Sequence, residues 1–93
     1  MTAHAVVTMT ITDSETFESY RSLAGPAMAK HNVTPLEVSK DLTHLEGEGE
    51  LPTLAVILTF PDRDAALAWY NDPDIANVHA LRNASGSSNI ILL

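Results

Sequence analysis

The sequence predicts an α+β fold, and the stretch from residue 54 to residue 70 is the first reason for this prediction. Residues 54–60, Leu-Ala-Val-Ile-Leu-Thr-Phe, are apolar at nearly every position, which is typical of a strand that is buried on both faces. Pro61 cannot continue a strand ladder, and Asp62 can cap a helix that continues through residues 65–70. A central strand, a tight turn and a helix therefore follow one another directly.

The second reason is the N-terminal third of the chain, which reads as a strand and an amphipathic helix. Residues 4–12 alternate in polarity, as in a strand with one apolar face and one mixed face. Asp13 is suited to cap the following helix, and Gly25-Pro26 is expected to kink or restart it. The apolar residues of this helix recur with helical spacing and can pack on a sheet: Phe17, Tyr20, Ala24, Ala27 and Met28.

The remaining segments complete the order of elements. Residues 36–39 alternate in polarity like a strand near a sheet edge, with an irregular extension toward Leu45, and residues 46–50 form a turn. Asp72-Pro73-Asp74 is a strong start signal for a further helix. We expect residues 84–88 to be a loop and residues 89–93 to be an apolar last strand.

This order, β-α-β-β-α-β with a split second helix, is the ferredoxin-like plan, with a four-stranded antiparallel sheet and helices on one face. We expect one such domain over residues 1–93. Because the central and last strands are apolar on both faces, the face without helices would expose a large apolar patch, which monomers rarely tolerate. We therefore expect a homodimer in which two copies pack sheet to sheet.

The composition excludes several kinds of partner and site. The net charge of −7, from 5 basic and 12 acidic residues, argues against binding to nucleic acid or to an anionic membrane, because both need a basic face. Cysteine is absent, so the sequence offers no disulfide framework, no thiolate nucleophile and no Cys-based zinc site. The N-terminus shows no signal-peptide pattern, which predicts a cytoplasmic protein.

Motifs from the first helix to the last carry a family resemblance: Asp13-x-Glu15-x-Phe17-x-x-Tyr20, Leu45-Glu46-Gly47, Phe60-Pro61, Ala66-x-x-Trp69-Tyr70-x-x-Pro73 and Leu81-Arg82. Together they resemble domain-of-unknown-function family 1330 (DUF1330). The resemblance implies the dimeric α+β barrel superfamily, which includes cofactor-free monooxygenases, haem-dependent enzymes, lactone isomerases and ligand-binding regulatory domains. It therefore implies the same homodimer and leaves the activity open.

Four residues are candidates for a small-molecule site: Tyr20, Trp69, His79 and Arg82. Arg82 shares a helical stripe with Val78 and His79, so its guanidinium can point inward and bind a carboxylate or an enolate in bidentate fashion. The structural alternative is an ion pair with an acidic residue or a cation at a helix C-terminus. Trp69 and Tyr70 can line a pocket between the helices and the sheet, and Tyr20 can join them. The alternative is that these aromatic side chains belong to the core, where a buried Tyr20 hydroxyl needs a partner or a cavity.

Metal and cofactor sites are not indicated. The histidines show no short ligand spacing: His4, His31, His44 and His79. The acidic turn at residues 46–50 is better explained as a solvated loop than as a calcium site, which needs more oxygen ligands in a defined order. The sequence contains no Ser-His-Asp order, no phosphate-binding glycine loop and no dinucleotide fingerprint.

Two functional hypotheses from different classes remain. In the first, the protein is a cofactor-independent enzyme that acts on a small organic acid or ketone-like metabolite, with Tyr20, His79 and Arg82 polarising and orienting the substrate. In the second, it is a non-catalytic homodimer that binds a small ligand or has a structural role. A pocket that joins Arg82 to an imidazole would favour the enzyme, whereas a filled core at that place would favour the second hypothesis.

Overall fold

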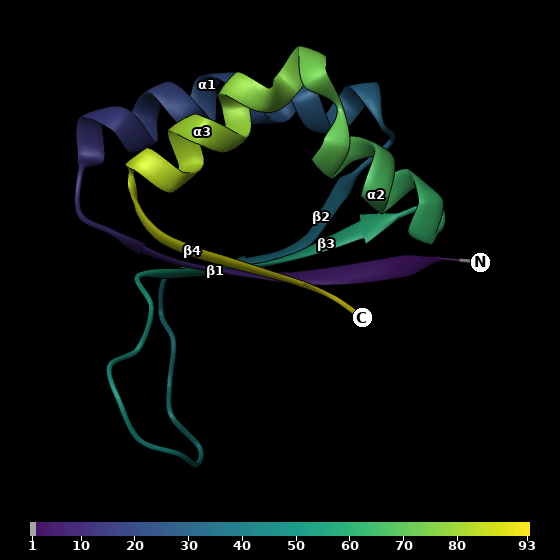
Figure 1. Cartoon of the computed structure of the whole chain (residues 1–93). Helices are drawn as coiled ribbons and strands as arrows, with labels where there is room; N and C mark the ends of the chain where they lie inside the picture. The colour runs from purple at the N-terminus through teal and green to yellow at the C-terminus, as the bar shows by residue number, and fades with distance from the viewer. Residues whose placement is uncertain (1) are drawn as a thin grey trace.

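The computed structural model describes residues 2–93 and confirms the α+β class and the ferredoxin-like plan. Helices cover one face of an antiparallel sheet, and the other face is open (Figure 1). The elements are β1 (Ala3–Ile11), α1 (Ser14–Lys30), β2 (Thr34–Ser39), β3 (Leu54–Phe60), α2 (Arg63–Asn71), the 3₁₀ turn η1 (Pro73–Ile75), α3 (Ala76–Ala84) and β4 (Gly86–Leu92). The four strands lie in the order β2-β3-β1-β4, so that the two central strands are β3 and β1.

The hydrophobic core lies between the sheet and the helices. Alternate side chains of β1 and β3 point toward the helices, as the period of two of a strand requires. The core consists of Ala3, Ala5, Val7, Met9, Phe17, Ala27, Val33, Leu54, Leu58, Phe60, Ala66, Trp69, Ile75 and Val78. In the single chain only the helix-covered face of β3 is buried, and the prediction of two buried faces for this strand therefore depends on what covers the other face.

The helix start signals read from the sequence are confirmed. The Asp13 side chain accepts a hydrogen bond from the Thr16 amide at 3.1 Å, and the Asp62 side chain accepts one from the Ala65 amide at 2.7 Å. Of the two outcomes expected at Gly25-Pro26, a kink or a restart, the restart is wrong, because α1 runs without interruption to Lys30. Pro26 lies inside the helix, and Ala27 directly after it is buried in the core.

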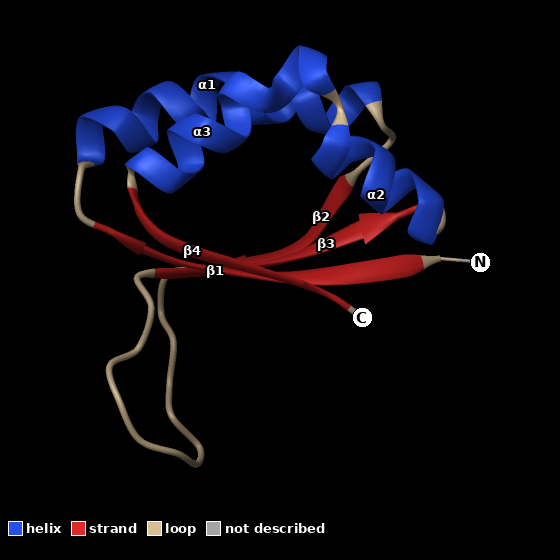
Figure 2. Cartoon of the chain, viewed as in Figure 1, coloured by secondary structure: helices blue, strands red, loops and turns tan. Residues whose placement is uncertain are grey.

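Two strand boundaries differ from the predictions. β4 begins at Gly86 instead of residue 89, because Ser87 and Ser88 pair with β1 although their small polar side chains suggest a loop. β2 ends at Ser39, and residues 40–53 form a long loop that projects from the sheet on the side opposite the helices (Figure 2). Leu45, expected to extend the strand, is 97% exposed at this loop, since the loop offers it no apolar surface to cover it.

The open face of the sheet is less apolar than the sequence suggested. One aliphatic row crosses it, because Val6 of β1 pairs with Ile57 of β3 on one side and with Ile91 of β4 on the other. The next row contains Thr8 and Asn89, which pair with each other. The predicted large apolar patch is therefore a narrower band between polar rows.

A substitution at Gly86 tests how β4 is joined to β1. Gly86 has a φ of 153°, and a Cβ at this position would lie 1.9 Å from the Thr10 carbonyl oxygen. We expect Gly86→Ala to lower the free energy of unfolding by more than about 2 kcal/mol, measured by urea denaturation. Ser87→Ala, one residue further along the strand, is the control and should stay within about 0.5 kcal/mol of the wild type. Equal stability of the two variants would contradict this account of the strand start.

Candidate functional site

Arg82 lies in the last turn of α3, and its side chain is directed into the space between the helices and the sheet. Only 2% of the residue is exposed. It belongs to the inward stripe predicted from the sequence, and the other members are also buried: Ile75, Val78 and His79. A guanidinium stays charged at any ordinary pH, so this position places a permanent positive charge inside the protein.

The buried guanidinium has few partners. Its Nη1 atom donates a hydrogen bond to Nδ1 of His79 at 2.8 Å, and its Nε atom has no hydrogen-bond partner among residues 2–93. The guanidinium carbon lies 5.9 Å from the ring centroids of both Tyr20 and Trp69, within the range of cation–π attraction. Within the described chain no carboxylate forms an ion pair with Arg82, so the ion-pair alternative is not observed. The position of Arg82 in the last turn of α3 agrees with the other alternative, a cation at a helix C-terminus.

His79 holds Arg82 through a fixed tautomer. Its Nε2 atom lies 3.1 Å from the carbonyl oxygen of Trp69, and a carbonyl can only accept a hydrogen bond, so Nε2 carries the proton. Nδ1 is therefore left as the acceptor for Arg82. Burial lowers the pKa of His79 below its usual value, and the neighbouring charge of Arg82 acts in the same direction. The imidazole is neutral near pH 7, and both of its nitrogens are engaged.

Two cavities meet at Arg82. The first, which we call the α2 cavity, has a volume of about 250 Å³ and lies against α2, α3 and β4. The second, which we call the α1 cavity, has a volume of about 370 Å³ and lies between α1 and the strands β1, β2 and β3. Three residues line both cavities: Trp69, Arg82 and Ile90. The guanidinium is thus positioned where a ligand in either cavity can reach it.

The structure brings together all four residues that the sequence singled out. Trp69 is a core residue that packs on Phe60, with 5.6 Å between the ring centroids. It also lines both cavities, so it is a core residue and a cavity wall at once. Tyr20 packs on Phe17 at 6.0 Å and lines the α1 cavity. His79 contacts the Trp69 ring edge-on, with 4.8 Å between the ring centroids.

Tyr70, which the sequence offered as a pocket residue beside Trp69, lines the α2 cavity, whereas sequence reasoning missed two polar residues that also line it: Asn83 and Ser88. The Ser88 hydroxyl is buried without a hydrogen-bond partner among residues 2–93. It was missed because residues 84–88 were expected to be a loop. The usable signal is the alternation of the last strand, which places Ser88 on the same face as Ile90 when the strand is extended back to Gly86.

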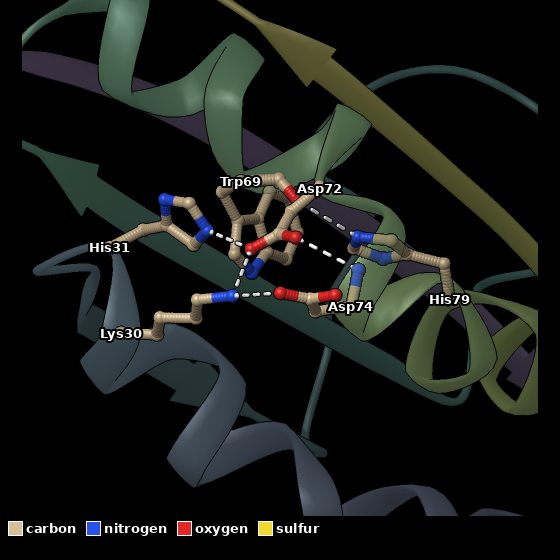
Figure 3. Close-up of polar contacts among 6 residues, drawn as sticks. All are labelled: Lys30, His31, Trp69, Asp72, Asp74 and His79. Atoms are coloured by element: carbon tan, nitrogen blue, oxygen red, sulfur yellow. Dashed lines mark hydrogen bonds and ion pairs between the residues drawn. The ribbon is translucent and has the colours of Figure 1, made fainter.

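A second polar cluster joins the end of α1 to the start of η1 (Figure 3). The Asp72 carboxylate lies 2.7 Å from Lys30 Nζ and 2.7 Å from His31 Nε2, and it also accepts from the Asp74 amide at 2.9 Å. Lys30 and His31 hold the pKa of Asp72 well below its usual value. These residues line neither cavity, and their contacts fix the point from which η1 and α3 start.

Neither a cluster of metal-ligating side chains nor a membrane-spanning helix is present in the described part of the chain. Among residues 2–93, no three His, Asp or Glu side chains gather closely enough to hold a metal ion. Over the same residues, no helix has the length and apolar character needed to cross a membrane.

Comparison with protein families assigns the chain. The model of the domain of unknown function DUF1330 matches residues 2–93. The chain belongs to this family. A comparison with curated proteins gave no match, so the family assignment brings no activity with it.

Solved structures confirm the fold of this DUF1330 member. A protein of unknown function from Rhodopseudomonas palustris is 18% identical, with 99% of this chain and 80% of that chain covered and a TM-score of 0.84. A dimeric ferredoxin-like protein of unknown function from Jannaschia sp. is 13% identical, with 100% and 98% covered and a TM-score of 0.72. SnoaB from Streptomyces nogalater, described as a cofactor-independent oxygenase, is 17% identical, with 99% and 90% covered and a TM-score of 0.70. At these identities the likeness shows the fold alone.

The Asp72 cluster generates a prediction about acid stability. The pKa of Asp72 is lowered in the folded protein, so its contribution to stability is present above the unfolded value of about 3.9 and is lost as the pH falls below it. Asp72→Asn keeps an acceptor for the Asp74 amide but removes the charge. We expect this variant to be less stable near neutral pH and to lose less further stability on acidification, measured by urea unfolding from about pH 7 to about pH 3.

The matched control is Asp41→Asn, which removes one negative charge from the exposed loop after β2, where Asp41 forms no ion pair among the described residues. This variant should follow the wild-type pH profile. If Asp41→Asn and Asp72→Asn change the profile equally, the Asp72 cluster does not act as a specific clamp.

Proposed function

We propose that the protein binds a small organic acid or an enolisable ketone beside Arg82, with the guanidinium holding the anionic oxygen. The observation that carries this proposal is a buried guanidinium with no carboxylate partner in the described chain, at the junction of two cavities. Removing a charge from water costs several kcal/mol, and this cost is normally offset by a partner of opposite charge. An anionic ligand would supply the missing partner.

The geometry of the guanidinium favours a carboxylate. His79 engages Nη1, and the unpartnered Nε belongs to the other edge of the fork, which it shares with Nη2. Two parallel donors on one edge match the two oxygens of a carboxylate. His79 thus acts as a positioning residue in this proposal, because it fixes the guanidinium and leaves the carboxylate-binding edge for the ligand.

The aromatic surroundings favour a ligand with a planar or unsaturated body. Tyr20 and Trp69 flank the guanidinium at 5.9 Å, and the Tyr70 ring lies 5.2 Å from the His79 ring. Flat π-surfaces gain contact area with flat ligands, and polar groups such as Asn83 can fix their orientation. A conjugated acid or the enol form of a ketone has this shape.

A cofactor-independent enzyme is the second candidate, and the hydrogen bond between the His79 imidazole and Arg82, which lines both cavities, favours it. A guanidinium that holds an enolate oxygen stabilises the negative charge that develops when a proton leaves the neighbouring carbon. Both His79 nitrogens are engaged, and a neutral phenol is too weak a base to take a proton from carbon. We therefore propose that the Tyr20 hydroxyl donates a hydrogen bond to the enolate oxygen and that water accepts the proton that leaves the carbon. SnoaB, which shares the fold, is described as a cofactor-independent oxygenase.

We further propose that two copies associate through the open faces of their sheets. Structural neighbours from Jannaschia sp. and Bacteroides fragilis are described as dimeric, and both share this fold. In this chain the aliphatic row of Ile57, Val6 and Ile91 would be covered by the same row of a second copy. Burial of this row would also give β3 the second covered face that its sequence indicates.

Arg82→Met tests the ligand proposal. Methionine keeps much of the apolar stem and removes the charge, and no carboxylate of the described chain is orphaned by this change. We expect the free energy of unfolding to stay within about 1 kcal/mol of the wild type or to rise, whereas loss of a buried ion pair would cost about 3–5 kcal/mol. The thermal shift that millimolar organic acids produce in the wild type should disappear in the variant.

The control is Arg63→Met, which makes the same chemical change at an exposed position on α2 outside both cavities. It should keep the wild-type thermal shift. If no acid or enolisable ketone in a metabolite panel shifts the wild type, the ligand proposal is wrong.

Ile57→Asp tests the association of the sheets. A charge in the aliphatic row would be buried without a partner in the dimer, at a cost of several kcal/mol, comparable to the whole stability of a small domain. We expect the wild type to be dimeric at micromolar concentration in light scattering and the variant to be monomeric or unfolded. Leu23→Asp, on the exposed side of α1, should remain dimeric. A monomeric wild type would rule out the proposed dimer.

A further inference from the structure

Basic residues are concentrated around one cavity in a chain that is otherwise acidic. The chain has only 5 basic residues against 12 acidic ones, and three of the basic residues line the α1 cavity: Arg21, Lys40 and Arg82. Among residues 2–93, no acidic side chain lines it. Because like charges repel one another, gathering three cations around one cavity raises the free energy of the ligand-free protein. A bound anion would lower it.

The three cations differ in depth. Arg82 is buried, whereas the Arg21 side chain is 56% exposed and Lys40 is exposed at the end of β2. Arg21 contacts Glu18 at 3.0 Å, an exposed pair of small energetic value that leaves most of the Arg21 donors available. Lys40 forms no ion pair among residues 2–93. The cavity therefore has one cation inside and two at its solvent-exposed part.

The lining between these cations is apolar and has room for a ligand. Side chains of the core such as Phe17, Leu54 and Leu58 contribute to it, and α1 contributes the small residues Ala24 and Gly25. The volume of about 370 Å³ lies within the range of known ligand sites, roughly 300–1,000 Å³, and exceeds that of the α2 cavity, about 250 Å³. The α1 cavity is the better container for a ligand with an apolar body.

We infer that the ligand occupies the α1 cavity and carries two anionic groups, one at each end of an apolar body. This inference rests on the proposed function, because it takes Arg82 as the anchor of the inner carboxylate. The outer anionic group contacts Arg21 and Lys40 where the cavity meets solvent. The ligand class is therefore an elongated dicarboxylate or a carboxylate with an equivalent second anion.

Octanoate and octanedioate are suitable probes, because they share a carbon chain and differ only in the second carboxylate. We expect calorimetry to show tighter binding of octanedioate to the wild type. Lys40→Gln and Arg21→Gln should each lower the affinity for octanedioate roughly two- to fivefold, as expected for exposed charge pairs. The affinity for octanoate should stay nearly unchanged. Arg63→Gln, which removes a positive charge outside the cavity, should change neither affinity.

The location is tested by narrowing the cavity. Ala24→Leu adds volume on the stripe of α1 that lines the α1 cavity and not the α2 cavity. We expect it to abolish binding of both probes while the protein remains folded by circular dichroism. A folded Ala24→Leu protein that binds both probes as the wild type does would overturn the assignment to the α1 cavity.

The outcomes separate the two proposals. If both acids bind the wild type equally well and both are lost in Arg82→Met, the proposed function stands and the dianionic ligand is wrong. If Lys40→Gln and Arg63→Gln lower the affinity for octanedioate equally, the effect comes from the net charge of the protein, and the inference of a dianionic ligand is also wrong. If neither acid binds the wild type, or if Arg82→Met binds both as the wild type does, the proposed function fails together with the inference.

Discussion

The hydrogen bond between Arg82 and His79 is the interaction on which the candidate site depends. A permanently charged group in the interior needs acceptors, and His79 can serve as one only while it is neutral. Its neutrality follows from burial and from the charge of Arg82 itself, and its tautomer follows from the carbonyl of Trp69. His79 and Trp69 thus fix the guanidinium of Arg82, and the edge that they leave unpaired defines what the site can bind.

Elements far from the site determine where this group lies. Arg82 is on the short helix α3, and α3 follows η1 directly, so the position of η1 sets the position of the guanidinium. Asp72, at the start of η1, is held by Lys30 and His31 at the end of α1. The same helix α1 carries Tyr20, which contacts the guanidinium from another side. The C-terminal end of α1 and a residue near its middle therefore both influence the position of one buried charge.

The sequence predicted the fold closely and the site only in part, for physical reasons. Strand alternation and helix caps such as Asp13 and Asp62 are local, and they were read correctly. The inward stripe of α3 was also local, and it placed Arg82 in the interior. The lack of an ion-pair partner for Arg82 and of a hydrogen-bond partner for the buried Ser88 hydroxyl, both among the described residues, depends on strand pairing and on contacts between distant segments. No local pattern contains that information.

The α1 cavity and the buried charge are two costs that a single ligand can offset. Small residues on α1 leave space that larger side chains would fill, and Arg82 is desolvated without an ion pair, so the ligand-free protein gives up stability in both respects. An anionic ligand with an apolar body would fill the space and pair with the charge at once. Binding to the folded state alone stabilises it in proportion to the logarithm of ligand concentration. Only a ligand with both an apolar body and an anionic group would then stabilise the protein in both respects. The cavity and the buried charge together would therefore make binding specific for this class of ligand.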